Sequence, residues 1–434
     1  MGRERELRVL LEAFERARGG HGQVVFLVAE AGMGKSRLLA VLRQRIAGQA
    51  GWQEGHCLSF GRAMTFHPLV DLLRRQLAIE DVDGEAAVAA KIEHGLTGIG
   101  PDLASAIPYL RTLLSVDPGD AEVRAMSPAQ RRGETFEALR RLVVQSAERE
   151  PQVLVIEDLH WIDSASEQFL TSLIESVPAL RVLLVFTYRP GYVNPFGERS
   201  YFTRIVPAAL STEESARIAE SVLGVDVLPV DLRSVVAAKA EGNPFYIEEL
   251  VRSLEESGAL QRVEGRLALT RPLSQIAIPG TVQDVIAARI DRLAEAPKLT
   301  LQLASVIGRE FSRRLVDRVS QIGEDTDGAL RELGALELIH ERRRLPELAY
   351  AFKHALTQDV AYASLLVQRR GELHRLVGTA IEELYDDRLP ELYEVLAHHF
   401  SHTDDAERAL AYLVRAAEKA VSYTHLTLPT KRIV

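Results

Sequence analysis

The feature that most constrains this chain is a loop rich in glycine between an apolar run and a helical pattern. The apolar run, residues 24–28, reads Val-Val-Phe-Leu-Val, which is typical of a strand buried on both faces of a parallel sheet. A helical pattern begins at Lys35. The segment that joins them ends on lysine and serine, and its residues are Ala29, Glu30, Ala31, Gly32, Met33, Gly34, Lys35 and Ser36. A strand, a glycine-rich turn and a helix in this order predict a phosphate-binding loop, or P-loop.

The loop holds the residue types that a nucleoside triphosphate requires. Glycines let main-chain N–H groups approach phosphate oxygens, Lys35 supplies a charge for the β- and γ-phosphates, and the Ser36 hydroxyl is a ligand for Mg²⁺. Ala29 stands where the usual pattern has its first glycine, so weakened nucleotide binding stays open. We expect ATP and Mg²⁺ as cofactors, with nucleotide contacts from Glu30, Ala31, Gly32, Met33, Gly34, Lys35, Ser36 and Arg37.

Two acids follow a second apolar run, residues 153–156, and an arginine follows a third, residues 182–186. A P-loop needs an acid at the end of a neighbouring strand; we expect Glu157 to complete the Mg²⁺ shell and Asp158 to orient the attacking water, although the two roles are exchangeable. Arg189 could contact the γ-phosphate, because ligands of open α/β sheets bind at the carboxyl edge. The alternatives are a plain acidic helix start and a solvated strand-end arginine.

These runs, flanked by helical pattern, predict an α/β P-loop fold with a parallel sheet. We expect the ATPase domain at residues 1–200, with a possible extra strand at His56–Phe60 and a helical insertion at about 71–150. A helical lid follows at 201–270, with a helix start at Ser211, and a winged-helix-like domain at 271–370. Beyond Tyr201 the pattern predicts isolated strands only near Ile339 and Ala349.

The remaining segments are a helical, alanine-rich stretch at 371–420 and a short tail at 421–434. The stretch resembles one copy of a tetratricopeptide-like unit, without a second copy at a fixed period. The tail breaks the pattern with threonines and Pro429, and we expect it to be non-native sequence.

Composition limits the location and the partners more than the activity. The net charge of -9 argues against a broad nucleic-acid or anionic-lipid surface, so nucleic acid is a possible but not favoured partner. The single cysteine, Cys57, excludes an internal disulfide. No long apolar segment or signal peptide is evident, so we expect a cytoplasmic protein with no membrane partner.

Several of these segments together resemble a known family, the signal-transduction NTPases with numerous domains, within the AAA-like class related to origin-recognition ATPases. The resemblance spans about residues 1–420 and is carried by residues 2–7 (Gly-Arg-Glu-Arg-Glu-Leu), the P-loop, 157–163 (Glu-Asp-Leu-His-Trp-Ile-Asp), 187–189 (Thr-Tyr-Arg) and 242–245 (Gly-Asn-Pro-Phe). It is closest to the ATPase part of bacterial regulators with a class III adenylate/guanylate cyclase domain upstream and tetratricopeptide repeats downstream.

The resemblance implies a nucleotide held between the sheet domain and a helical lid. It places Pro244 near the adenine and Gly2, Arg3 and Glu4 along the base, and it implies a winged helix that transmits the nucleotide state. Slow hydrolysis would serve as a timer. Protein partners or self-association through helical repeats are implied as well, whereas no cyclase residues are present and we expect no cyclase activity.

Three other interpretations stay open. His398 and His402 lie four apart on a helical pattern, but without an acid or cysteine partner an ordinary helix surface is favoured over a metal site. Arg342, Arg343 and Arg344 at a hairpin tip could contact DNA phosphates, so an ATP-triggered winged-helix transcription regulator is the alternative function. A third possibility is a protein scaffold whose P-loop no longer binds nucleotide.

Overall fold

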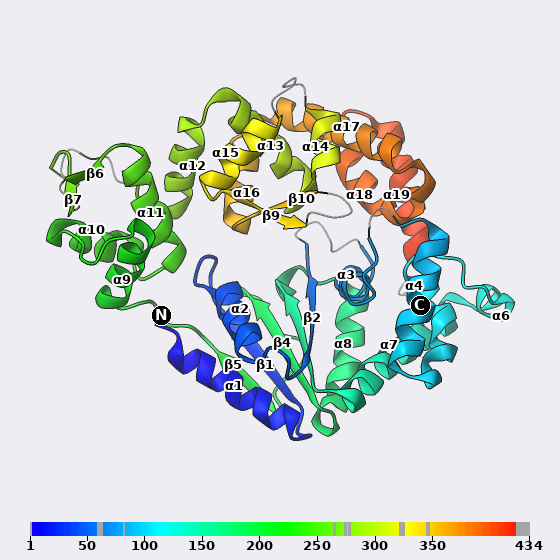
Figure 1. Cartoon of the computed structure of the whole chain (residues 1–434). Helices are drawn as coiled ribbons and strands as arrows, with labels where there is room; N and C mark the ends of the chain where they lie inside the picture. The colour runs from blue at the N-terminus through cyan, green and yellow to red at the C-terminus, as the bar shows by residue number, and fades with distance from the viewer. Residues whose placement is uncertain are drawn as a thin grey trace, which may run out of the picture. The chain divides into compact units, whose positions relative to one another are not determined.

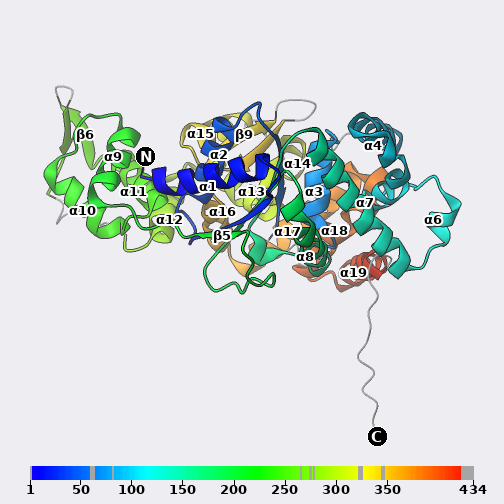
Figure 2. The same ribbon diagram turned by 90° about the horizontal axis from the view of Figure 1, so that it is seen from below.

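The structure is a computed structural model of the chain (Figure 1 and Figure 2). It describes residues 2–58, 64–80, 83–263, 266–272, 276, 279–320, 326–343 and 348–421. The chain divides into two compact units. The sheet unit comprises Arg5–Ala29, Leu39–Val206 and Tyr385–Val434, and the lid unit comprises Met1–Glu4, Glu30–Leu38 and Pro207–Leu384.

A five-stranded parallel sheet forms the centre of the sheet unit (Figure 1). Its strands are β1 (Gln23–Val28), β2 (Gly51–His56), β3 (Gln152–Glu157), β4 (Val182–Tyr188) and β5 (Phe202–Ile205), in the order β2-β3-β4-β1-β5. Every residue of β1, β3 and β4 is buried. The three inner strands are the three apolar runs of the sequence, because a strand covered on both faces has no polar side. The α/β fold with a parallel sheet is therefore confirmed.

Helices pack against this sheet and fill the segment between β2 and β3. They are α1 (Glu4–Arg18), α2 (Lys35–Arg45), α3 (His67–Gln76), α4 (Glu85–Ile99), α5 (Ile107–Leu113), α6 (Ala121–Ala125), α7 (Pro128–Arg149) and α8 (Ser164–Ser176), with short 3-10 turns η2 (Pro101–Ala106), η3 (Leu159–Trp161) and η4 (Val177–Ala179). The core joins strand residues such as Phe26 and Phe186 to Leu139 of α7 and Phe169 of α8. The segment between β2 and β3 is thus mostly helical, as its pattern indicates.

The lid unit contains two groups of elements. The lid helices are α9 (Thr212–Leu223), α10 (Val230–Ala240) and α11 (Pro244–Glu256), and Figure 1 and Figure 2 both show them beside the two-stranded sheet of β6 (Leu260–Val263) and β7 (Arg266–Leu269). Helix α9 begins at the predicted position, where Ser211 and Glu214 form a capping box. A cluster of buried side chains that includes Leu223, Leu232 and Leu250 holds the lid helices together.

The second group, which we call the hairpin region, follows the lid helices. It comprises α12 (Val282–Arg292), α13 (Glu295–Ile307), β8 (Glu310–Ser312), α14 (Arg313–Val319), α15 (Thr326–Ala335), β9 (Ile339–Arg343), β10 (Ala349–Phe352), α16 (Ala355–Ala363) and α17 (Val367–Leu384). Strands β9 and β10 pair antiparallel, as predicted, and β8 completes a three-stranded sheet in the order β8-β10-β9. The sheet unit resumes after η7 (Asp386–Arg388) with α18 (Leu389–Ser401) and α19 (Ala406–Val421).

Several strands differ from the sequence prediction. The strand predicted at His56–Phe60 lies earlier, at Gly51–His56, where it forms an edge of the sheet. Its residues Gly-Trp-Gln-Glu-Gly-His are only partly buried and carry no apolar pattern. Strands β5, β6, β7 and β8 were not expected beyond Tyr201, and they are only three or four residues long. Segments this short hold no readable alternation, so pairing with neighbours decides their structure.

Some predictions fall on residues outside the described ranges. They are Arg344, most of the tail at 421–434, and residues 59–60 of the strand expected after His56. In the parts of the chain that the structure describes, no helix is both long and apolar enough to cross a lipid bilayer.

Candidate functional site

The predicted phosphate-binding loop forms a tight turn after β1. Gly32 and Gly34 have φ angles of +83° and +86°, in the left-handed region that other L residues rarely adopt. Ala29 is buried, and its φ angle is not positive. Its N–H donates to the Tyr188 carbonyl oxygen at 3.2 Å. Alanine in place of the first glycine therefore imposes no backbone strain, which removes one reason to expect a disabled loop.

The loop leads directly into the first turn of α2, which begins at Lys35. The Lys35 ammonium donates to the Glu30 carbonyl oxygen at 3.1 Å and so reaches back across the loop. No acidic residue lies in the first turn of α2, so no carboxylate of this turn offsets the positive end of the helix. Ser36 and Arg37 are exposed on the same turn. This arrangement of N–H groups, a helix end and an ammonium suits a bound phosphate.

The first turn of lid helix α11 holds the loop from one side, within the lid unit. The Asn243 side-chain amide donates to the Ala31 carbonyl oxygen at 3.2 Å, and the Phe245 N–H donates to the Gly32 carbonyl oxygen at 3.2 Å. The approach is so close that a Cβ atom on Gly32 would lie 2.7 Å from Asn243 Oδ1 and 2.9 Å from Phe245 Cβ. Gly32 is thus required both by its φ angle and by the lid.

The N-terminal residues also join the loop to the lid. The Arg3 guanidinium donates to the Ala208 carbonyl oxygen at 2.5 Å and to the Met33 carbonyl oxygen at 3.3 Å. Gly2 has a φ of +71°, and a Cβ there would meet the side chains of Leu210 and Glu214. Glu4 begins α1. The residues that the family resemblance assigns to the base therefore lie in the same unit as the loop.

His354 packs on the same part of the lid from the hairpin region. Its ring centroid lies 3.9 Å from that of Phe245, whose N–H binds the loop. Burial lowers the pKa of His354 to about 4, against the opposing charge of Glu248. Its Nε2 atom is buried and has no hydrogen-bond partner among the described residues. A neutral, buried imidazole therefore sits one side chain away from the loop.

The predicted acids lie at the carboxyl edge of the sheet, in the sheet unit. Glu157 is the last residue of β3 and is 9% exposed. Asp158 has a φ of 58°, where the chain turns away from the strand, and its N–H donates to the buried Thr187 hydroxyl at 3.0 Å. Arg189 follows β4 directly and is half-buried. Because β1, β3 and β4 are parallel neighbours, the edge that carries these residues is also the edge where β1 ends at Val28.

A second polar cluster borders the acids at the same edge. His56 is paired with Glu157 in the register of β2 and β3, and its Nδ1 lies 2.9 Å from Asp71 of α3. Arg75 donates to the other oxygen of Asp71 at 2.8 Å. Burial opposes the charge on Asp71, but the hydrogen bond from His56 and the charge of Arg75 lower the pKa of Asp71 to about 2. Burial also opposes the charge on His56 and by itself lowers the pKa of His56. The hydrogen bond and the charge of Asp71 outweigh this effect, so the pKa of His56 lies above its ordinary value.

The predicted site residues thus fall into two groups. The loop, base and lid residues lie in the lid unit: Gly2, Arg3, Glu4, Glu30, Ala31, Gly32, Met33, Gly34, Lys35, Ser36, Arg37 and Pro244. The acids Glu157 and Asp158 and Arg189 lie in the sheet unit, and the chain passes from it into the loop at the Ala29–Glu30 peptide bond. A hydroxyl in the first group and carboxylates in the second are oxygen donors of the kind that Mg²⁺ prefers, so each group by itself holds residue types suited to ATP and Mg²⁺.

Sequence reasoning missed several residues that position the site. Asn243 caps α11 with its side-chain oxygen while its amide holds the loop, yet its place before a proline signals only a helix start. Thr187 stands in a segment that carries the family resemblance, but no role is predicted for it or for His354. No sequence signal could join His56 to Asp71, because the two are 15 residues apart in different elements.

Two surface predictions are modified. His399 is 1% exposed and belongs to the core, so the prediction of an ordinary helix surface is wrong at this position. The rings of His398 and His402 lie with centroids 4.6 Å apart and are tilted by 58° to each other. Of the hairpin arginines, Arg342 forms an ion pair with Glu310 at 3.3 Å. A carboxylate beside the guanidinium weakens its attraction for a DNA phosphate.

Comparison with known families agrees with this geometry. Residues 1–185 match the profile of the AAA ATPase domain family, and residues 211–266 match a domain family of unknown function, DUF8739. The second match covers the lid helices and part of the β6–β7 hairpin. The parallel sheet and the P-loop agree with the first match, so the N-terminal part of the chain is an α/β P-loop domain similar to the AAA ATPase domain family.

Similar proteins are known at the level of the whole chain. An uncharacterized protein of Rhizobium meliloti (strain 1021) is 29% identical over 447 residues, which cover 97% of this chain and 41% of that protein. A signal transduction ATPase with numerous domains (STAND) from Pyrococcus horikoshii, which carries a tetratricopeptide repeat sensor, has a similar structure. The TM-score is 0.53 at 12% identity, with 97% of this chain and 54% of that chain covered. The chain therefore spans about half the length of these two proteins or less.

Proposed function

We propose that the chain binds Mg-ATP at residues 30–37 and acts as a nucleotide-dependent signalling switch, with slow ATP hydrolysis that resets it. The observation that carries the proposal is the contact of lid helix α11 with the phosphate-binding loop. The backbone of the loop at Ala31 and Gly32 is hydrogen-bonded to Asn243 and Phe245. A phosphate bound by the loop N–H groups therefore acts on a segment that the lid already touches.

The residues of the chain would divide the work as follows. Lys35 would bind the β- and γ-phosphate oxygens, and Ser36 and Glu157 would hold Mg²⁺, which would neutralise phosphate charge. Asp158 orients the attacking water, and its position is fixed by the hydrogen bond to Thr187. Arg189 contacts the γ-phosphate. Gly2, Arg3, Glu4 and Pro244 border the base, a proposal supported by their place beside the loop in the lid unit.

The switch would work through two states with different affinity for ATP. A ligand shifts an equilibrium only by its differential affinity for the two states. Contacts of the loop with α11 are the ones that a bound triphosphate can change. The hairpin region, which we interpret as winged-helix-like, would carry that change onward because it packs on α11.

The wider context is also a proposal. We infer that the chain is part of a longer cyclase-type regulator with helical repeats, through which it would bind protein partners or itself. The Pyrococcus horikoshii protein carries a tetratricopeptide repeat sensor, and α18 and α19 pack against each other as a pair of helices suited to the start of such repeats. DNA binding has less support, because Arg342 is already paired with Glu310.

The test is Mg-ATP binding by isothermal titration calorimetry with wild type, Lys35→Ala and Arg45→Ala. Arg45 is the matched control because it is exposed at the other end of the same helix. We expect Kd near ~1 μM for wild type and the control, and at least about 100-fold weaker binding, or ~2.7 kcal/mol, for Lys35→Ala. Equal affinity in all three proteins, or no heat and no thermal shift with wild type, would support the scaffold alternative instead.

Asp158→Asn separates binding from hydrolysis. The substitution keeps the size of the side chain and removes the charge that orients water, so we expect turnover to fall about 100- to 1000-fold. The Kd for Mg-ATP should change less than about 3-fold, because the acid binds water and not phosphate. Single-turnover hydrolysis with radiolabelled ATP measures the first quantity and calorimetry the second. Unchanged turnover would assign the water to Glu157.

A further inference from the structure

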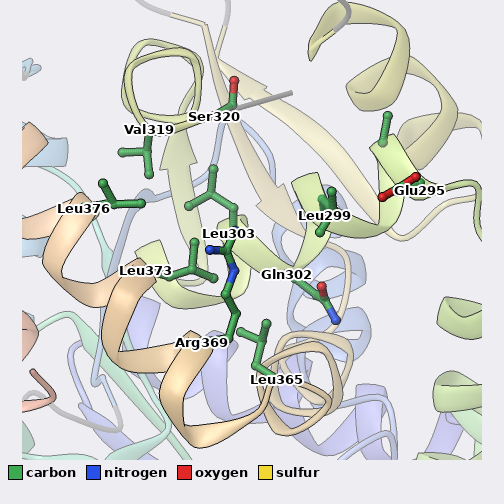
Figure 3. Close-up of a pocket in the computed structure, with 11 residues that line it drawn as sticks. Glu295, Leu299, Gln302, Leu303, Val319, Ser320, Leu365, Arg369, Leu373 and Leu376 are labelled. Atoms are coloured by element: carbon green, nitrogen blue, oxygen red, sulfur yellow. The ribbon is translucent and has the colours of Figure 1, made fainter. Parts of the chain in front are cut away.

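The hairpin region contains a pocket of about 410 Å³ that none of the predicted nucleotide contacts line. It lies in the lid unit, and its lining residues come from α13, from the end of α14, and from Leu365 and α17 (Figure 3). Pockets of roughly 300–1,000 Å³ are the usual size for small-molecule sites. The volume alone therefore admits a small ligand.

The walls of the pocket are apolar and firmly held. Leu303 is 4% exposed and Leu373 is 6% exposed, so both are fixed by the core around them. Leu299 is 37% exposed and stands at the mouth. A wall of this kind binds an aliphatic or aromatic group through apolar burial and does not collapse when it is empty.

One cation projects into this apolar surrounding. Figure 3 shows the Arg369 side chain extending from α17 towards Leu303, with Leu373 on one side and Leu365 and Gln302 on the other. Among the described residues, it forms an ion pair with Glu372, one turn further along α17, at 2.9 Å. Both side chains of this pair are 39% exposed, and a pair so exposed to water is weak. The remaining N–H groups of the guanidinium can bind a second carboxylate, whose planar geometry they match.

We propose that this pocket binds a small monocarboxylate with an apolar body, the carboxylate on Arg369 and the body against Leu299, Leu303 and Leu373. A neutral apolar ligand would bury part of the guanidinium without replacing its lost water, which is unfavourable. A polyanion such as a nucleotide is disfavoured because Glu295, also in the lining, repels additional negative charge. One cation, one opposing acid and leucine walls together select a single negative charge.

The ligand would connect two helices of the hairpin region. Leu299 and Leu303 belong to α13, whereas Arg369 and Leu373 belong to α17. A carboxylate bound to one helix with its apolar body against the other favours whichever arrangement of α13 and α17 fits both. The binding itself does not depend on ATP, so it stands or falls separately from the proposed nucleotide switch.

Calorimetry and saturation-transfer NMR with octanoate test the proposal, with octanol and octylamine as head-group controls. We expect octanoate to bind at least 10-fold more tightly than either control. The affinity should be the same in Lys35→Ala, which removes nucleotide binding but not this pocket. Equal binding of octanoate, octanol and octylamine, or no binding of octanoate up to millimolar concentration, overturns the proposal.

Variants locate the site. Arg369→Gln should weaken octanoate binding at least 10-fold, and the matched control Arg375→Gln should not, because Arg375 is exposed on the same helix outside the lining. Leu299→Trp should block the pocket at its mouth without disturbing the buried wall, and circular dichroism verifies that it folds. Octanoate binding that survives both Arg369→Gln and Leu299→Trp places the ligand elsewhere and refutes the site. Self-association of wild type that Leu299→Trp abolishes would show that a second copy fills the pocket instead.

Discussion

Helix α11 has two ends that are held by different forces. At its N-terminal end, Asn243 and Phe245 contact the phosphate-binding loop through two hydrogen bonds of 3.2 Å. At its C-terminal half, Glu249 and Glu256 bind Arg289 of α12 in an ion cluster where Arg289 is 2% exposed and Glu249 is 4% exposed. One end is joined by neutral hydrogen bonds, and the other by an ion cluster in which Arg289 also donates to the Leu336 carbonyl oxygen.

The difference indicates which contact can change during a switch. A typical neutral hydrogen bond contributes about 1 kcal/mol, so ATP binding can compensate for its loss. Removing one partner of a buried ion pair costs about 3–5 kcal/mol because the other charge stays buried. The lid helices and the hairpin region are therefore expected to move as one body, with the loop contact as the part that opens.

Breaking the strong end should have the largest effect. Arg289→Ala leaves the buried Glu249 without its cation, and burial already raises the pKa of Glu249 despite Arg289. We expect the free energy of unfolding to fall by about 3–5 kcal/mol, measured by urea denaturation. Arg292→Ala is the matched control, because Arg292 lies on the same helix, is 39% exposed, and contacts Ser253 at 3.1 Å and Glu256 at 4.0 Å. A loss no larger than that of the control, which should be below ~1 kcal/mol, would remove the idea of a rigid pair.

At the N-terminal end of α11, which contacts the loop, His354 should make the stability of the folded state depend on pH. Its folded pKa of about 4 is below the unfolded value of 6.5, so the folded state prefers the neutral ring. The stability from this residue is fully present above pH 6.5 and is lost as pH falls from 6.5 towards 4, by about 3 kcal/mol at most.

The measurement compares urea denaturation of wild type and His354→Gln between pH 7 and pH 4. The comparison is needed because His398 also has a pKa of about 4, lowered by burial and by His402, and contributes in the same direction. The difference between the two proteins isolates His354. Parallel stability curves would mean that the ring is protonated at little cost, and hence that the packing on Phe245 is loose.

The two ends of α11 also differ from each other in how far the sequence predicts the residues that they contact. Gly32, Gly34 and Lys35 are recognisable because a backbone that curls around phosphate permits few alternatives at these positions. Glu157 and Asp158 are recognisable because they end a wholly apolar strand. These features are local, and so is the apolar character of the three inner strands that predicted the parallel sheet.

Contacts between distant segments left no such signal. Asn243 and Ala31 are 212 residues apart, and Arg289 is 40 residues from Glu249. In the sequence, an arginine of an amphipathic helix is assigned to the solvent-exposed face, because the acidic partner that allows its burial comes from another helix. The short strands β6, β7 and β8 were not predicted because pairing with neighbouring strands, and not their own sequence pattern, determines their structure. The loop of the candidate site was thus predictable, and its lid contacts were not.

Substitution of two glycines of the loop tests the contact between the loop and α11, with a smaller expected loss of stability. Gly32→Ala combines a φ of +83° with a Cβ that would lie 2.7 Å from Asn243, whereas Gly34→Ala has a φ of +86° and nothing within 4 Å. We expect backbone strain of ~1 kcal/mol in both, and about 1–2 kcal/mol more in Gly32→Ala from the displaced lid. Thermal unfolding without nucleotide measures the difference. Equal losses in the two variants would mean that the lid does not press on the loop.

The smallest effect should come from the two separate functions of Asn243. Its oxygen caps α11 by accepting from the Phe245 and Tyr246 N–H groups at 3.0 and 3.3 Å, and its amide holds Ala31. Asn243→Ser keeps a capping oxygen but cannot donate across to the loop, so the free energy of unfolding should fall by about 1 kcal/mol, the contribution of the lost hydrogen bond. Asn243→Ala removes both the cap and the loop contact and should cost about 2 kcal/mol. Both variants lose the hydrogen bond that joins the lid to the loop, so the affinity for Mg-ATP, measured by calorimetry, should change equally in the two variants. A change of affinity only in Asn243→Ala would mean that the helix cap, and not this hydrogen bond, connects α11 to the nucleotide.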